Sequence, residues 1–137
     1  MDIIEQTRAL AREIQKDGRY LKFRVALQAA EEDAGLQDLI GQYNRKRLEL
    51  QNELRLPESK RDNSRIQAYR QELGAVYLSV MKNPNMAAYN GARAGLSALM
   101  RRVTAILEQS ANGADPDTAD YTAPECSGDC ASCAGCR

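Results

Sequence analysis

All four cysteines of the chain lie near its C-terminus, at Cys126, Cys130, Cys133 and Cys136. Their spacing is C-x3-C-x2-C-x2-C, and positions 1–125 contain no cysteine. Thiolates this close together can converge on one soft cation, because each gap spans about one turn of chain around a tetrahedral metal or an iron–sulfur cube. This cysteine segment is therefore the first candidate for chemistry in the sequence.

Three interpretations of the motif remain open. The spacing is the bacterial ferredoxin order read backwards, with Pro124 before the first cysteine, which favours an iron–sulfur cluster. Zinc also accepts four thiolates, although four-cysteine zinc sites usually consist of two separated C-x2-C pairs on a small folded platform. The third interpretation is a tail of free or redox-active thiols. Disulfides are a weaker explanation, because cysteines crowded at one end cannot join distant helices.

Composition indicates one domain followed by a tail. The chain has 137 residues and equal numbers of acidic and basic side chains, 19 of each. The acidic excess lies at the C-terminus, where residues 111–137 contain five carboxylates and only one cation, Arg137. No apolar run is long enough to span a bilayer and no signal-peptide pattern is present, so we expect a cytoplasmic protein. We divide the chain into a helical domain, 1–112, and a flexible acidic tail, 113–137, with a turn-rich tether over 110–124.

Apolar residues recur at helical spacing throughout the domain, without the alternation typical of strands. The sequence therefore predicts an all-α fold, an antiparallel bundle of about five helices with long heptad-like stripes. The first predicted helix carries Ile3, Ile4, Thr7, Leu10 and Ile14 and ends near Asp17-Gly18, with Gly18 as the left-handed C-terminal residue. The second carries Tyr20, Phe23, Leu27 and Ala30, and the third runs from an N-cap at Asp33 through Leu54. A capping box at Ser64 and Gln67 begins the fourth, and the fifth follows Asn83-Pro84 and ends near Asn112-Gly113.

The last two predicted helices have apolar stripes that alternate steps of three and four, as in coiled-coil packing. A domain with one Phe and no Trp buries little core alone, so we expect homo- or hetero-oligomers. The predicted partner or oligomer interface consists of Leu73, Val76, Val80, Tyr89, Leu96, Leu99 and Val103.

The sequence lacks the residue types and motifs that catalysis usually requires. It contains no histidine, no phosphate-binding glycine loop and no nucleophile beside an obvious base, so we expect neither enzymatic activity nor a small-molecule substrate. Basic groups such as Arg45-Lys46-Arg47 and Arg101-Arg102 are typical of solvated helix faces. Without aromatic interleaving or an RNA-binding module, we do not expect direct nucleic-acid binding.

The block N-P-N-M-A-A-Y-N-G-A-R-A-G-L-S-A-L, from Asn83 to Leu99, resembles the YlbF/YmcA family of small helical bacterial regulators. It is similar to the family pattern N-P-x-x-x-x-Y-x-x-A-x-x-x-L-x-x-L, and the resemblance extends over about residues 1–110. The C-terminal cysteine cluster favours the YlbF-like branch.

This resemblance implies a regulatory partner protein that acts with YmcA-like and YaaT-like proteins in a complex carrying [4Fe–4S] clusters. Such complexes influence RNA processing by RNase Y, and with it competence, sporulation and biofilm formation. Only the cluster role carries over to individual residues, Cys126, Cys130, Cys133 and Cys136, which match the thiol-rich tail of the family. The competing hypotheses are a zinc-binding or thiol-redox sensor and a purely structural helical scaffold.

Overall fold

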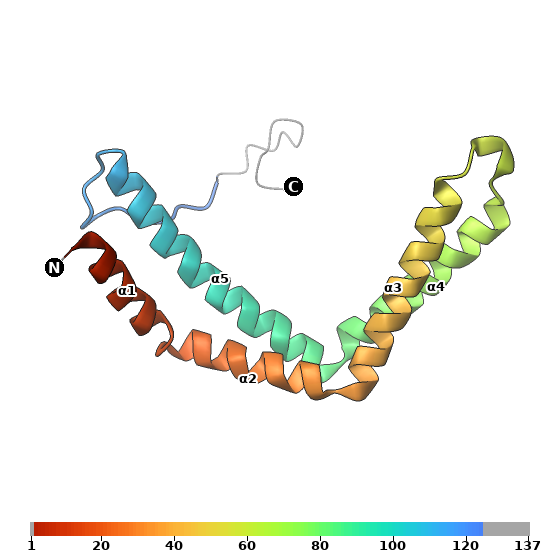
Figure 1. Cartoon of the computed structure of the whole chain (residues 1–137), viewed down its shortest axis with the longest axis horizontal. Helices are drawn as coiled ribbons and strands as arrows, with labels where there is room; N and C mark the ends of the chain where they lie inside the picture. The colour runs from red at the N-terminus through yellow and green to blue at the C-terminus, as the bar shows by residue number, and fades with distance from the viewer. Residues whose placement is uncertain (1, 125–137) are drawn as a thin grey trace. The chain divides into compact units, whose positions relative to one another are not determined.

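A computed structural model describes residues 2–124 of the chain. These residues form five α-helices and one short 3-10 turn, without strands (Figure 1). The elements are α1 (Ile3–Ile14), α2 (Gly18–Glu32), α3 (Ala34–Leu54), η1 (Glu58–Lys60), α4 (Asn63–Lys82) and α5 (Pro84–Ala111). The predicted all-α fold is confirmed. The chain divides into two compact units, residues 1–96 and 97–137, and α5 runs through the division.

Short polar side chains fix where the helices of the first unit begin. Asp33 accepts a hydrogen bond from the Leu36 backbone N–H at 3.0 Å, which confirms it as the N-cap of α3. Two other predicted caps are wrong. Gly18 is the first residue of α2, with Asp17 as its N-cap, and α4 is capped by Asp62, one residue before the helix. Both corrections have one cause. In each case an aspartate accepts a free N–H group of the first helical turn, so the helix begins after that aspartate and not where Gly18 or Ser64 had suggested.

The core of the first unit lies where α3 packs against α4 and the end of α2. The two long helices run side by side in opposite directions, joined by the turn that contains η1 (Figure 1). Leu36 is completely buried there, and Ala30, Val76 and Val80 pack with it. Partly buried side chains surround this cluster: Leu39, Ile40, Tyr43, Met86 and Tyr89.

The turn between α3 and α4 is closed by two charged side chains that the apolar pattern does not reveal. Glu53 is buried, and its carboxylate accepts a hydrogen bond from the Asp62 backbone N–H at 2.8 Å. Arg61 donates to the carbonyls of Leu54 and Leu56, both at 2.9 Å, and so satisfies the free C-terminal end of α3. The hairpin register is therefore fixed at its tip by hydrogen bonds as well as at its base by apolar packing.

The end of α5 matches its prediction. Gly113 has a positive φ of 95°, the conformation that terminates many helices, and α5 ends at Ala111. The flexible tether expected over 110–124 stays a prediction, and part of this stretch contacts α5 through specific polar groups described below. Composition alone suggested the tether, and pairing between residues 18 positions apart leaves no trace in composition.

Candidate protein-interaction surfaces

A network of polar side chains ties two helix junctions of the first unit together. The Asn83 side-chain oxygen accepts from the backbone N–H groups of Asn85 and Met86, at 2.8 and 3.1 Å, and so caps α5. Pro84 occupies the first helical position, where a missing N–H costs nothing. The side-chain amides of Asn83 and Asn85 both donate to the Asp33 carboxylate, at 3.1 and 2.9 Å. One carboxylate therefore holds the α2–α3 and α4–α5 junctions together.

These hydrogen bonds lower the pKa of Asp33 from its ordinary value. The backbone N–H of Leu36 has the largest effect, followed by the amides of Asn85 and Asn83. A carboxylate that accepts several hydrogen bonds is stabilised in its charged form. The network therefore favours the ionised form of Asp33, in which both carboxylate oxygens accept hydrogen bonds at the entry of α5.

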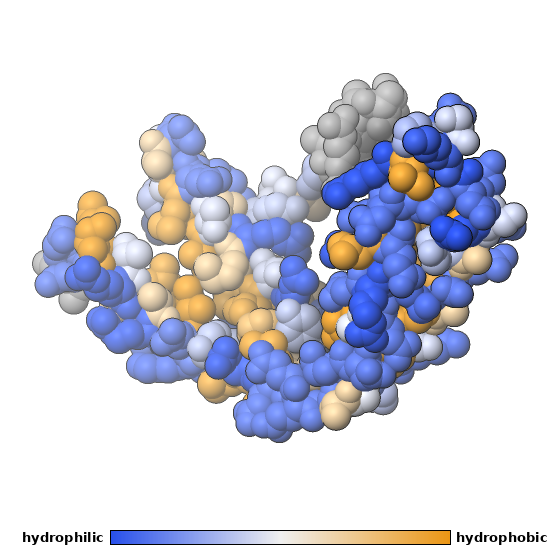
Figure 2. Space-filling model, turned by 45° about the vertical axis from the view of Figure 1, so that its right-hand side comes forward, coloured by the Kyte–Doolittle hydropathy of each residue, from blue (hydrophilic) through white to orange (hydrophobic). Residues whose placement is uncertain are grey.

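An apolar groove is formed by the α3–α4 hairpin and the first turn of α5. It has a volume of about 270 Å³ and is lined by Ile40, Tyr43, Tyr77, Val80, Met81 and Met86. Tyr43 and Tyr77 face each other across it with ring centroids 6.2 Å apart. Tyr77 and Met81 remain 49% and 39% exposed, so they present apolar surface to solvent. Figure 2 shows hydrophobic patches on the α3–α4 arm, set among hydrophilic side chains.

The predicted interface residues separate into two groups. Val76 and Val80 are only 9% and 8% exposed and belong to the core of the hairpin, so they have little surface to offer a partner. The other five are half-buried: Leu73, Tyr89, Leu96, Leu99 and Val103. Tyr89 packs against Phe23 of α2, with ring centroids 5.8 Å apart. The large apolar side chains that α4 exposes are Tyr77, Leu78 and Met81, of which Tyr77 and Met81 stand next to Val76 and Val80 in the sequence. Apolar spacing in steps of three and four does not show which of two adjacent apolar residues is buried.

The second unit contains a segment that returns along α5, residues 114–124, which we call the C-terminal strap. A turn at Asp115 reverses the chain, with its carbonyl accepting from the Ala119 N–H at 2.9 Å. The Asp120 carboxylate then receives two hydrogen bonds from the Arg102 guanidinium, at 3.0 and 2.8 Å. The Asp120 carbonyl accepts from the Gln109 side chain at 2.9 Å.

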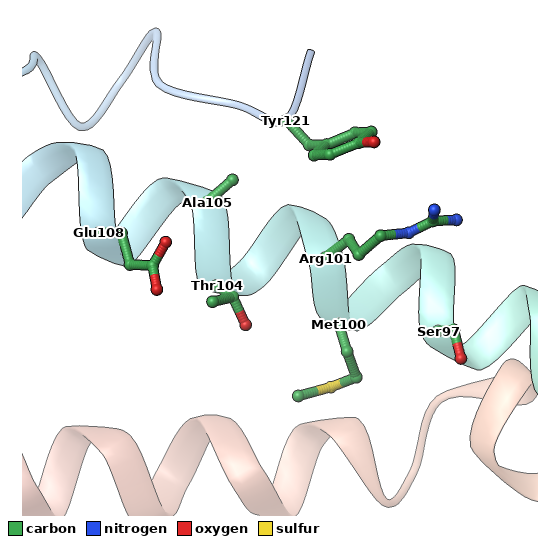
Figure 3. Close-up of a pocket in the computed structure, with 7 residues that line it drawn as sticks. All are labelled: Ser97, Met100, Arg101, Thr104, Ala105, Glu108 and Tyr121. Atoms are coloured by element: carbon green, nitrogen blue, oxygen red, sulfur yellow. The ribbon is translucent and has the colours of Figure 1, made fainter. Parts of the chain in front are cut away.

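Tyr121 adds an aromatic contact to the C-terminal strap. Its ring lies over the Arg101 side chain, with the guanidinium carbon 5.4 Å from the ring centroid (Figure 3). Beside this stack is an open groove of about 480 Å³ on α5, lined by Ser97, Met100, Arg101, Thr104, Ala105, Glu108 and Tyr121. The strap is therefore fixed at adjacent residues by an ion pair and by a cation–π contact.

Residues 3–112 match the family described as "Control of competence regulator ComK, YlbF/YmcA". The chain belongs to the YlbF/YmcA family. No curated protein and no solved structure matches it significantly. The family match ends one residue after α5, so the C-terminal strap and the cysteine segment follow the family domain.

Membership of the YlbF/YmcA family gives the chain a regulatory role, and the structure explains the motif that suggested it. Asn83 and Pro84 are the N-cap and first residue of α5, Tyr89 packs on α2, and Ala92 is buried. The motif therefore caps the N-terminus of α5 and packs its first turns against α2.

The predicted metal ligands Cys126, Cys130, Cys133 and Cys136 lie outside the described residues and stay a prediction. Within residues 2–124, no three acidic, histidine or cysteine side chains gather into a potential metal site. None of the helices described is long and apolar enough to cross a membrane.

Proposed function

We propose that this protein is a cytoplasmic regulatory adaptor without catalytic activity, whose helical domain binds protein partners and whose cysteine segment holds a [4Fe–4S] cluster. The partners are YmcA-like and YaaT-like proteins, and the assembly modulates RNA processing by RNase Y and, through it, competence, sporulation and biofilm formation. Family membership supports the regulatory part. The observation that carries the cluster is the gathering of every thiol of the chain at C-x3-C-x2-C-x2-C.

The donor set fits the cluster in its chemistry. Four thiolates supply one ligand to each iron of a [4Fe–4S] cube, and the group, when bound, would supply a redox- and oxygen-sensitive element. The chain has no histidine to complete a mixed site. The same four thiolates suit zinc, so a zinc-binding or thiol-redox sensor is the second candidate.

The apolar groove of the hairpin supports the protein-binding part. Tyr, Met and other large apolar groups are enriched where protein interfaces form, and exposed Tyr77 and Met81 border a groove with an almost wholly apolar lining. We propose that a long helix of a second family member covers this groove, in a homo- or hetero-oligomer.

The deciding experiment is anaerobic purification, with and without co-expressed partners, followed by iron, sulfide and zinc analysis and visible absorption spectroscopy. We expect iron with matching sulfide, lost in the double variant Cys130→Ser/Cys133→Ser, while far-UV circular dichroism stays unchanged because the helical domain contains no thiol. Zinc in place of iron would support the sensor. Absence of any metal, even with partners, would leave a helical scaffold.

A further inference from the structure

The α3–α4 hairpin joins the rest of the first unit through two single residues. Asp33 alone separates α2 from α3, and Asn83 alone separates α4 from α5 (Figure 1). Both residues have an extended backbone, with φ and ψ of −80° and 96° at Asp33 and of −64° and 128° at Asn83. Pro84 disfavours a helical conformation at the residue before it, so α4 and α5 stay separate helices. Ends of elements such as these two are where hinges form in proteins.

We propose that the hairpin pivots on Asp33 and Asn83, and that the hydrogen bonds from Asn83 and Asn85 to Asp33 form a latch that sets its angle to α2 and to the start of α5. The inference deepens the proposed function and rests on it, because the same angle shapes the apolar groove proposed to bind a partner. The three latch residues are positioning residues, which act on the groove only through the orientation of the helices.

The first argument is that the latch connects the hairpin to α5 through their helix caps. The Oδ1 atom of Asp33 accepts from the Leu36 backbone N–H at 3.0 Å and so caps α3. The Oδ2 atom accepts from the side-chain amides of Asn83 and Asn85, at 3.1 and 2.9 Å. The side-chain oxygen of Asn83 in turn caps α5. A continuous chain of hydrogen bonds therefore joins the first turns of α3 and α5, and a change in the angle between them must stretch it.

The second argument is that apolar packing leaves room for the angle to change. A groove of about 210 Å³ lies at the base of the hairpin, where α2, α3 and α5 meet. Its lining includes Leu27 and Ala30 of α2, Leu36 and Ile40 of α3, and Met86 and Tyr89 of α5. Close packing locks elements together, and here it is interrupted on one side of the junction. The polar latch therefore carries a large part of the constraint on the angle.

The third argument links the angle to the partner groove. Five of the six residues that line the groove of about 270 Å³ belong to the hairpin, and the sixth, Met86, belongs to α5. Met86 also lines the groove at the base, so it lies where the two grooves meet. Rotation of the hairpin moves Tyr43 and Tyr77 relative to Met86, and the flexible methionine side chain can follow. The latch thus holds the partner groove in one shape.

Distances between pairs of nitroxide labels, measured by double electron–electron resonance, test the pivot without a partner or a metal. In the full-length chain the four cysteines are replaced by serine, and labels are attached at Lys22→Cys on α2 and at Lys60→Cys at the tip of the hairpin, both exposed positions. With its 21 residues α3 is about 30 Å long, so a change of about 10° in its angle moves the tip by about 5 Å. The matched pair Lys60→Cys and Lys82→Cys lies wholly on the hairpin and should not respond to the latch.

The double variant Asn83→Asp/Asn85→Ala opens the latch while both helix caps remain. Aspartate caps a helix as well as asparagine does, so α5 keeps its cap, but both amide donors to Asp33 are lost and two carboxylates face each other. We expect the distance distribution between labels 22 and 60 to widen about twofold or more, and that between labels 60 and 82 to stay unchanged. Asn85→Ala alone, which leaves the Asn83 bond, should widen it less.

An exchanged pair separates the latch from a general loss of stability. In Asp33→Asn/Asn83→Asp the donor and the acceptor trade places, and asparagine at position 33 still caps α3, so the narrow distribution should return. An unchanged distribution between labels 22 and 60 in Asn83→Asp/Asn85→Ala would overturn the pivot. Equal widening for both label pairs would overturn it as well, because the hairpin itself would then have loosened.

Sedimentation keeps this test apart from the proposed function. Asn83→Asp/Asn85→Ala should weaken the association of the chain, with itself or with a co-expressed partner, by about fivefold or more, because only part of the population then has the competent groove. Unweakened association despite widened distances would refute control of the groove by the latch. Widened distances in a chain that associates with nothing would keep the pivot and remove the partner groove. Association lost in Tyr77→Asp, with distances insensitive to the latch, would keep the groove and remove the pivot.

Discussion

Leu36 is the most completely buried large side chain of the described residues, and Leu36→Ala measures how much that burial stabilises the fold. It is 0% exposed and packs against Ala30, Val76 and Val80, so truncation removes its whole transfer free energy and leaves a cavity. Buried leucines replaced by alanine cost about 3 kcal/mol or more. Leu48, on the same helix, is 54% exposed, so Leu48→Ala should cost at most about 1 kcal/mol.

Urea denaturation followed by far-UV circular dichroism checks the pair. With a slope of about 1.5 kcal/mol per molar urea, Leu36→Ala should lower the midpoint by about 2 M, and Leu48→Ala by well under 1 M. If Leu36→Ala does not fold, Leu36→Met conserves volume and should lose less than about 1.5 kcal/mol. Equal midpoint shifts for the two alanine variants would refute the placement of the core at the base of the hairpin.

Three further predictions concern the caps and surfaces. Asn83→Ala should destabilise the domain by about 2 kcal/mol in urea, because it removes the α5 cap and a hydrogen bond to Asp33, while Asn52→Ala, at an exposed position of α3, should be neutral. Tyr77→Asp and Met81→Asp should abolish self-association or partner binding in sedimentation experiments without loss of helix, unlike Ser79→Asp; unchanged association would exclude the groove. Acid titration should show helix lost as pH falls from about 4 toward 2. The pKa of Asp17 is lowered from 3.8 to about 2, mainly by its side-chain hydrogen bond to Arg19, and the pKa of Asp33 is also lowered. Both ionised carboxylates therefore stabilise the fold above about pH 4, and this stabilisation is lost when they are protonated. A flat signal over that range would contradict the capping roles.

The sequence predicts the helices well because local rules determine them. Apolar spacing locates all five, and Asp33, Pro84 and Gly113 act as their types predict. The errors are also local. Asp17 caps α2 beside the predicted Gly18, and Asp62 caps α4 two residues before the predicted Ser64. Only the backbone geometry shows which of these nearby residues caps the helix. Boundaries are thus uncertain by a residue or two even where the element is certain.

Contacts between distant residues could not be predicted in this way. Asp33 binds side chains 50 and 52 positions away, and Asp120 binds one 18 positions away, with no repeating pattern to link the partners. Glu53 reads as a solvated charge on the helix, yet it is buried because the Asp62 N–H and the Arg65 guanidinium, 3.8 Å away, meet it at the turn. The signal that could have revealed the burial of Glu53 is its position beside a turn, where a backbone N–H such as that of Asp62 needs a side-chain acceptor.

The stripe of α4 explains why the interface prediction was only partly informative. Steps of three and four mark a face wide enough for one edge to pack inside the chain and the other to remain in solvent. Val76 and Val80 lie on the inner edge, and Tyr77 and Met81 on the outer one, one residue further along in each case. The apolar side chains that pack on α3 fix which edge is inner, and these are known only once the hairpin has formed. A surface that binds a partner must therefore be sought beside the predicted stripe, at Tyr77 and Met81, where α4 still has apolar area to bury.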